Sequence, residues 1–516
     1  MKDSRSSARY GSPETATSAT TRREAQIRIA PEAVVLPTSA RIRATIALMI
    51  ATAMQAFDAT IANVALPQLE QSLGGGIDLG SWVMTSYLCA SAVMAIMTGW
   101  FRRRWGARRV FTVAIALFVA ASLLCAVAQS AVALIFFRLI QGAAAGIILP
   151  LSQAIILDLY PKQAHGRILA IWGATIMAGP MLGPVLGGVI TDLASWRWIF
   201  AVNAPIGVIA MLGLRSIPSL VEPNGAGRID GIGIILLITA VAALQLALQR
   251  SIGRIWPPAP ETIGETAVAL VALAAIVVQS RRSRFLLFRF EVFRDVNFAL
   301  AAAYNFMVGA LLFTTIVFVP ALSEGPLGWN ATQAGLAIAP RGVGTMATML
   351  AVRYVIDRVD HRALLAAGLV ITAGALELMS WVPPQGGELW LAATSAAQGV
   401  GVGLLFTPLS TLAFSTLSPD LRTDAAGVYN LSRQLGCAAG VATMTAVLQA
   451  GIENGFSALH RHGGVSGNSP THLFESVAFA AYTGCFRTLA IAAMALIPGI
   501  FLFRVMRQDK LITTPA

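Results

Sequence analysis

One carboxylate lies deep inside an apolar stretch near the start of the chain. Asp58 falls within residues 43–66, a segment long enough to cross a bilayer as a helix. A charge at membrane depth costs about 2.5–3.5 kcal/mol on insertion scales, so an acid retained there is a candidate functional group. The alternative is that Asp58 only pairs with a neighbouring helix or with a backbone group.

An arginine at the start of a later apolar segment is a candidate partner for this acid. Arg138 is followed by the small residues 142–146, which permit close packing between helices. A neighbouring guanidinium favours the charged carboxylate, whereas burial disfavours it. A carboxylate under both influences can load and release a proton. The alternative is that Arg138 extends its head group to the membrane surface.

A repeated glycine and proline pattern lies in the apolar segment 165–190. Its glycines recur every four residues on one helical face, which suits a closely packed partner helix, and its prolines remove backbone donors and favour bending. We predict a close-packed gate here, with a purely structural helix seam as the alternative. The predicted gate consists of Gly179, Pro180, Gly183, Pro184, Gly187 and Gly188.

The composition predicts that these residues lie in a membrane protein with many spans. Of 516 residues, 56% are hydrophobic and 12% are charged, whereas soluble domains carry about 25% charged residues. Fourteen segments are apolar enough to span a bilayer, so we expect an all-α polytopic membrane protein. They are 43–66, 80–101, 110–128, 131–156, 165–190, 197–217, 231–249, 265–280, 296–322, 332–356, 363–383, 389–415, 424–450 and 483–505.

The basic residues predict the orientation of these spans. Outside the spans, nearly all of the 37 lysines and arginines fall in the two tails and in alternate loops, which predicts that both termini are cytoplasmic. The net charge of +12 is thereby explained by topology rather than by nucleic-acid binding. The first residues lack the apolar core of a signal peptide. The four cysteines form no C-x-x-C pair, and no metal site is predicted.

Two related hairpins suggest an internal repeat. Gly99, Arg104 and Gly106 belong to a basic cytoplasmic loop, and Asp357 and Arg358 belong to a similar loop later in the chain. If two central spans are an insertion, the hairpins lie six spans apart, as in a transporter with two six-helix halves. The expected divisions are a disordered tail 1–40, a half 41–217, a linker with two helices 218–290, a half 291–505 with a long periplasmic loop 451–482, and a tail 506–516.

A substrate cavity is expected near the midplane between the two halves. Polar and aromatic residues of the spans are its candidate lining, although each is equally suited to bonding a neighbouring helix. These candidates are Gln55, Trp82, Gln153, Tyr304, Asn305, Gln398 and Gln434. Glu377 is a second intramembrane acid.

Four motifs resemble those of the fourteen-span drug:proton antiporters of the major facilitator superfamily, and most closely the EmrB-like members of the EmrB/QacA group. The motifs are Asp58 to Pro67, Arg138-x-x-Gln141-Gly142, the Gly179–Gly188 string, and Ser195-Trp-Arg-Trp with Asn203 and Pro205. Pro340-Arg341-Gly342 and the stretch Gly427 to Gly436 agree with this resemblance. It covers about 41–505.

The resemblance implies a bacterial inner-membrane exporter of lipophilic, cationic or aromatic compounds that is driven by proton entry and needs no cofactor. Asp58 would couple the proton, Arg138 would modulate it, and the segment 165–190 would form the antiport gate. It also implies a periplasmic adaptor protein and an outer-membrane channel as partners. The segment 451–482 would contact the adaptor. One departure concerns Arg103, where the superfamily usually has an acid, so the usual charge relay cannot use this residue.

Other functions fit the sequence less well. A dedicated exporter of one endogenous metabolite or siderophore shares every motif and is the leading alternative. An ATP-driven pump or an embedded enzyme is disfavoured because the sequence has no Walker motif and no H-E-x-x-H motif. An uncoupled facilitator would not need Asp58.

Overall fold

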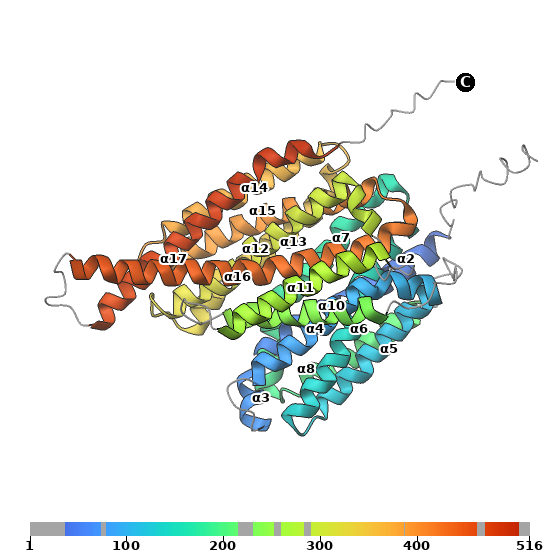
Figure 1. Ribbon diagram of the computed structural model, residues 1–516, viewed down its shortest axis with the longest axis horizontal. Coiled ribbons are helices and arrows are strands. Elements are labelled where there is room, and N and C mark those ends of the chain that lie inside the picture. Colours follow the sequence, from blue (N-terminus) through green and yellow to red (C-terminus); the bar gives the residue numbers. More distant parts are fainter. Residues whose placement is uncertain are drawn as a thin grey trace, which may run out of the picture.

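The computed structural model describes residues 37–64, 66–73, 79–214, 231–251, 260–282, 290–385, 387–461 and 470–504. These ranges form helices packed side by side in one bundle, and no strand occurs within them (Figure 1). The expectation of an all-α protein is therefore confirmed.

The first half of the bundle is built from residues before 215. Ser130 begins one of its long helices by accepting a hydrogen bond from the Ala133 amide, a capping contact that satisfies a free backbone donor. The helices are α2 (Thr38–Val64), α3 (Leu66–Leu73), α4 (Leu79–Trp105), α5 (Ala107–Ala126), α6 (Ala131–Leu159), α7 (His165–Leu193), α8 (Trp198–Ala201) and α9 (Asn203–Leu214).

The second half begins near residue 290. Asp295 and Asp360 cap helices by the same kind of contact, and Asn330 with Gln333 forms a reciprocal capping box. The helices are α12 (Val296–Glu324), α13 (Ala331–Val355), α14 (His361–Ser380), α15 (Glu388–Ser415), α16 (Arg422–Arg461) and α17 (Pro470–Ala495). Short 3-10 helices are Lys162–Ala164, Phe290–Arg294, Pro419–Leu421 and Ile497–Leu502.

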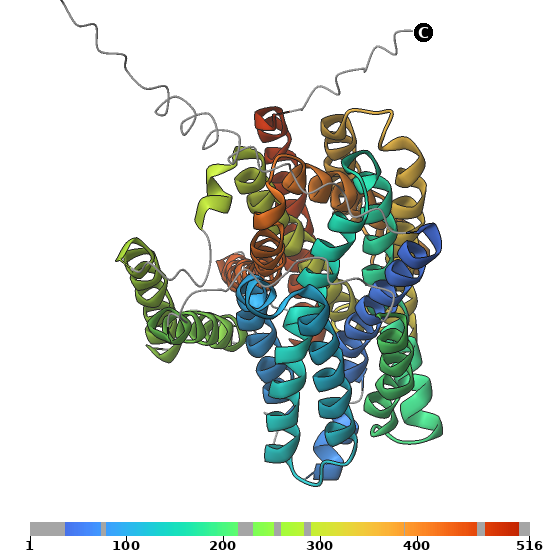
Figure 2. The same ribbon diagram turned by 90° about the vertical axis from the view of Figure 1, so that its right-hand side faces the viewer.

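Two further helices, α10 (Gly231–Ser251) and α11 (Pro260–Arg282), lie between the halves in the sequence. They pack against each other at the side of the bundle (Figure 2). Leu237 and Val241 of α10 join a hydrophobic cluster with Val93 and Ile96 of α4, and Leu431 of α16 packs against it. The additional pair thus covers the seam between α4 of the first half and α16 of the second.

The membrane-spanning helices agree with the predicted segments in position. Within the described ranges, eleven helices are long and apolar enough to cross a bilayer, and the apolar helical segments Trp198–Leu214 and Gly231–Ala247 are shorter. Each of the fourteen expected spans overlaps a helix, but the count of fourteen spans stays a prediction.

The two halves share a core at one end of the bundle. We call this end, which carries Arg102–Arg109, Arg358 and Arg422, the basic end. Here Trp172 and Phe406, one from each half, belong to one hydrophobic cluster. Farther away, Phe200 of the first half and Phe318 of the second belong to separate clusters. In Figure 1 the halves accordingly meet on the right and separate toward α3 and α17.

Residues 451–461 and 470–482 of the expected loop 451–482 are helical, which differs from the prediction, and residues 462–469 lie outside the described residues. Helix α16 continues to Arg461 and α17 begins at Pro470. Polar residues end the apolar pattern here, but two helices that pack together need no apolar pattern on every face. Phe456 stacks on Phe474 with ring centroids 6.1 Å apart, so the ends of α16 and α17 form a helical hairpin. Near the N-terminus, α2 begins at Thr38, slightly before residue 41, where the first half was expected to begin.

Candidate functional site

The side chain of Asp58 is fully buried in the middle of the first half. Its Oδ2 accepts a hydrogen bond from Arg138 Nη1 at 2.8 Å. Its Oδ1 accepts one from Gln141 Nε2 at 2.7 Å and one from Asn203 Nδ2 at 2.8 Å. The carboxylate of α2 is therefore held by donors from α6 and α9.

Ser122 of α5 completes this network from behind. Its Oγ accepts hydrogen bonds from Gln141 at 3.1 Å and from Asn203 at 2.9 Å, and it donates to the Phe200 carbonyl at 2.8 Å. Both amide side chains that bond Asp58 are thus fixed in position. Hydrogen-bond networks of this kind hold a buried charge in one geometry.

Arg138 is fully buried and does not reach the membrane surface. Its Nη1 donates to both Asp58 and Gln141 Oε1, whereas Nε and Nη2 have no hydrogen-bond partner among the described residues. The guanidinium carbon lies 4.3 Å from the centroid of the Tyr87 ring. A single nitrogen and an aromatic face therefore position this arginine, and its guanidinium forms no bidentate contact with the carboxylate.

The predicted gate helix α7 packs directly against the helix that carries Asp58. A Cβ added at Gly179 would overlap the Ala56 carbonyl, and one at Gly183 would overlap Thr60 Oγ1. One at Gly187 would lie 2.9 Å from a side-chain carbon of Ile61. The three glycines thus face α2 on both sides of Asp58. Pro180, Pro184 and Gly188 lie in the same helix.

A second cluster of charged residues joins the two halves at the basic end. Asp158 of α6 accepts from Arg102 at 2.5 Å and from Arg422 of the second half at 3.2 Å. Arg103 of α4 forms an ion pair with Asp424 of α16. We call these five residues the inner ion cluster. Two of its contacts cross from one half to the other.

The predicted hairpin residues lie around this cluster. A Cβ at Gly99 would overlap the Asp424 carboxylate, so glycine makes room for the buried acid. Gly106 has a φ of 81°, which glycine adopts without steric cost, and it makes the tight turn from α4 to α5. Arg104 and Arg358 are exposed, and Asp357 pairs with Arg167 of the first half at 2.5 Å.

The polar residues proposed to line a cavity lie in different surroundings. Gln55 donates to the Tyr87 hydroxyl, Asn430 donates across the halves to Gln153 at 3.5 Å, and Asn305 donates to the Tyr429 carbonyl at 2.6 Å.

Gln398 donates to Thr315 at 3.0 Å, and Gln434 is half-buried. Tyr304 instead donates to the carbonyl of Leu496, which follows α17 and precedes the 3-10 helix Ile497–Leu502, and Trp82 is 46% exposed. Glu377 pairs with Arg487 at 3.5 Å.

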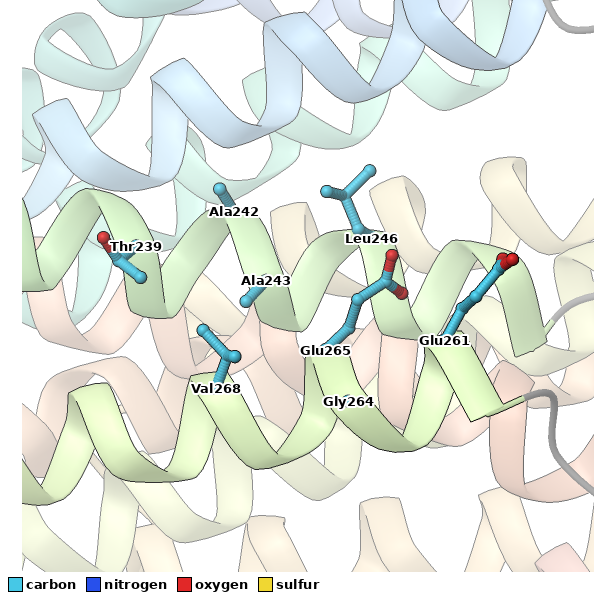
Figure 3. Close-up of a pocket in the computed structure, with 8 residues that line it drawn as sticks. All are labelled: Thr239, Ala242, Ala243, Leu246, Glu261, Gly264, Glu265 and Val268. Carbon is cyan, nitrogen blue, oxygen red and sulfur yellow. The ribbon is translucent and has the colours of Figure 1, made fainter.

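One groove lies away from Asp58, between the two additional helices (Figure 3). Its volume is about 720 Å³. It is lined mainly by small and apolar side chains of α10 and by the first turns of α11, where Glu261 and Glu265 lie one turn apart.

The sequence of residues 48–441 matches the family model of the Major Facilitator Superfamily. The protein belongs to the Major Facilitator Superfamily. As a member of this superfamily it is a membrane transporter rather than an enzyme, and it acts on small molecules.

Two curated relatives and one solved structure agree with this assignment. The chain is 34% identical over 403 residues to the multidrug export protein EmrB of Escherichia coli K12, covering 78% of this chain and 79% of that protein. It is 32% identical over 413 residues to the probable multidrug resistance protein EmrY of the same strain, with 78% and 79% covered. The predicted resemblance to EmrB-like proteins is confirmed.

The structure is also similar to the crystal structure of the human organic anion transporter MFSD10, with a TM-score of 0.60. The similarity covers 91% of this chain and 100% of that chain at 17% sequence identity, and at this identity it shows the shared fold alone.

Several residues of the site could not be assigned from the sequence. Asn203 stands in a recognised motif, yet its role as a donor to Asp58 becomes visible only when α9 lies beside α2. Ser122, Tyr87 and Asp424 carry no sequence signal beyond their polarity. A polar residue inside a predicted span is the one signal that could have found them.

Proposed function

We propose that this transporter exports lipophilic compounds in exchange for protons, with Asp58 as the proton-carrying group. The observation that supports this proposal most directly is the buried pair of Asp58 and Arg138 on helices that pack beside α7. Protonation of Asp58 would neutralise the carboxylate and weaken its bond to Arg138. The loss of this bond would act on α2, the helix that carries Asp58 and packs against the glycine face of α7.

Alternating access then requires the inner ion cluster to open and close. In the present arrangement the basic end is closed by Arg103 with Asp424 and by Asp158 with Arg422. Rigid rocking of one half against the other would break these contacts and expose the path to the basic end. The distribution of basic residues supports a cytoplasmic basic end, cytoplasmic termini and an inner-membrane location for this protein.

An efflux assay tests the proposal. Wild type and Asp58→Asn are reconstituted into liposomes, and export of a lipophilic fluorescent dye is followed under an imposed pH gradient. Wild type should move dye uphill until a protonophore is added, and Asp58→Asn should not. Equal transport by both proteins regardless of the gradient would identify a facilitator.

A dedicated exporter of one metabolite or siderophore is the second candidate for this chain. It predicts the same proton coupling with a single accepted compound. A panel of chemically unrelated dyes distinguishes the two, because a multidrug exporter accepts several of them.

The helical hairpin of α16 and α17 is the proposed contact for a periplasmic adaptor that leads to an outer-membrane channel. Its two ends project beyond the neighbouring helices (Figure 1). Phe474 near the tip is 51% exposed. Deletion of 457–470 should abolish co-purification with an adaptor, and unchanged co-purification would refute this contact.

A further inference from the structure

The second half holds two arginines at membrane depth that have no acidic partner. Arg341 lies ten residues into α13, which places it about 15 Å from the start of that helix at 1.5 Å per residue. It is 9% exposed. Arg433 of α16 is half-buried. No carboxylate among the described residues lies within 4 Å of either side chain, whereas Arg138 of the first half is neutralised by Asp58.

The bonds of Arg341 use only part of its guanidinium. Nη1 donates to the Leu312 carbonyl and to Thr315 Oγ1, both at 3.0 Å. Nε and Nη2 make no hydrogen bond to another described residue and are not fully buried, so both donors are open to a further partner. A buried charge is normally paired, and an unpaired one inside a membrane is a candidate functional group.

Further unpartnered polar groups lie on α12 and α15, the helices that carry Thr315 and Gln398. Gln398 of α15 also donates to Thr315 Oγ1, so the side chains of Arg341 and Gln398 meet at one atom. Gln398 Oε1 and Ser395 Oγ, one helical turn apart on the same face of α15, are buried without a hydrogen-bond partner among the described residues. Thr314 Oγ1, one residue before Thr315 in the sequence, is also buried without a hydrogen-bond partner among the described residues.

We propose that Arg341, with the Ser395 hydroxyl as a second donor, binds the anionic group of the transported compound, while Nε2 of Gln398 donates to Thr315. The substrate class is then an amphipathic organic anion with a carboxylate or sulfonate on an apolar body. A guanidinium forms strong, directional hydrogen bonds to such groups. This inference deepens the proposed export function, and it favours anionic over cationic compounds.

The depth of Arg341 argues against a lipid head group as the natural occupant. A residue near the middle of a membrane-spanning helix lies below the head-group region. The anion must therefore come from a molecule that enters between the helices. Binding experiments in a bilayer of neutral phosphatidylcholine remove anionic lipid as a source.

The test compares one fluorescent probe in charged and neutral form. Purified protein in phosphatidylcholine nanodiscs is titrated with 11-(dansylamino)undecanoic acid and, separately, with its methyl ester. Wild type should bind the acid about tenfold or more tightly than the ester, because only the acid can pair with a guanidinium. Equal affinity for both forms would overturn the proposal.

The variants separate charge recognition from stability. Arg341→Gln should weaken binding of the acid about tenfold and leave the ester unchanged, and Arg341→Lys should bind the acid with intermediate affinity. Ser395→Ala, a smaller change, should weaken binding of the acid about threefold and leave binding of the ester unchanged. Arg487→Gln is the matched control, since that arginine is exposed in the same half and already has an acid partner.

Two outcomes would contradict the proposal. If Arg341→Gln and Ser395→Ala bind the acid as wild type does, Arg341 does not bind the anion. If both variants lose the acid and the ester equally, Arg341 only supports the packing of α12 against α13. Proton-driven dye efflux without any anion preference would leave the export function standing and remove this inference. Anion binding that depends on Arg341, without proton-driven efflux, would leave this inference standing and remove the proposed export function.

Discussion

Arg103 of the first half and Asp424 of the second half form an ion pair that joins α4 to α16. The side chain of Asp424 is fully buried and that of Arg103 is 27% exposed. Sequence comparison with the superfamily suggested that residue 103 could take no part in the usual charge relay. The charges are instead arranged in the opposite sense, with the base on α4 and the acid on α16.

This ion pair should stabilise the closed state of the basic end. Arg103→Gln leaves Asp424 buried without this partner, so the state that exposes the basic end should gain about tenfold in population, or about 1.4 kcal/mol. Distances between spin labels at positions 109 and 358, in a cysteine-free background, measure this population. Arg104→Gln is the control because Arg104 is exposed and adjacent. Identical distance distributions for the two variants would show that the pair does not hold the halves together.

The glycine face of α7 should tolerate no bulky side chain. Gly183→Leu inserts a side chain where even a Cβ would overlap Thr60, so transport should fall at least about tenfold while the protein still inserts. Gly374→Leu is the matched control, since a Cβ at Gly374 would meet nothing within 4 Å. Dye efflux normalised to the amount of protein in the membrane is the readout. Normal efflux by the Gly183 variant would remove the gate hypothesis.

Asn203 should matter because it donates directly to Asp58. Asn203→Ala removes one of three donors to a buried carboxylate, and hydrogen bonds to charged groups contribute about 1.5–3 kcal/mol. We expect a lower melting temperature in detergent and several-fold slower efflux. Asn430→Ala, which loses only a 3.5 Å contact to another side chain and a bond to its own helix, should change both less. The reverse order would mean that Asn203 does not support the acid.

Arg138→Lys should keep part of the activity. The ammonium retains the charge and can bond Asp58, but it loses the simultaneous bond to Gln141 and the contact with the Tyr87 ring. Efflux about tenfold slower than wild type is expected, and Arg138→Gln should be slower still. If Arg138→Lys were as inactive as Arg138→Gln, the guanidinium geometry rather than its charge would be essential.

The sequence predicted single residues better than their partners. Asp58, Arg138 and the glycines of α7 stand out because a charge or a run of small residues is unusual in an apolar segment. Ser122 does not stand out, since a lone polar residue in a span is common. Asn203 belongs to a motif, but its partner Asp58 lies on a helix far away in the sequence. The same reason explains why the pairing of Arg103 with Asp424 was missed.

The fold followed from hydropathy except at the ends of helices. Apolar length identifies where a helix crosses a membrane, but it does not show where that helix stops. Helices α16 and α17 continue with polar residues and pack against each other, as Phe456 and Phe474 do. A prediction from hydropathy therefore assigned the helical residues 451–461 and 470–482 to a loop.

Asp58 carries the proton in the transport cycle that we propose. The most direct test traps a pH-sensitive dye inside liposomes that contain the transporter, and then applies a gradient of a transported compound without any imposed pH gradient. In wild type, protons should move across the membrane in the direction opposite to the compound. Asp58→Asn should let the compound cross the membrane without moving protons. Proton movement by Asp58→Asn equal to that of wild type would contradict the account.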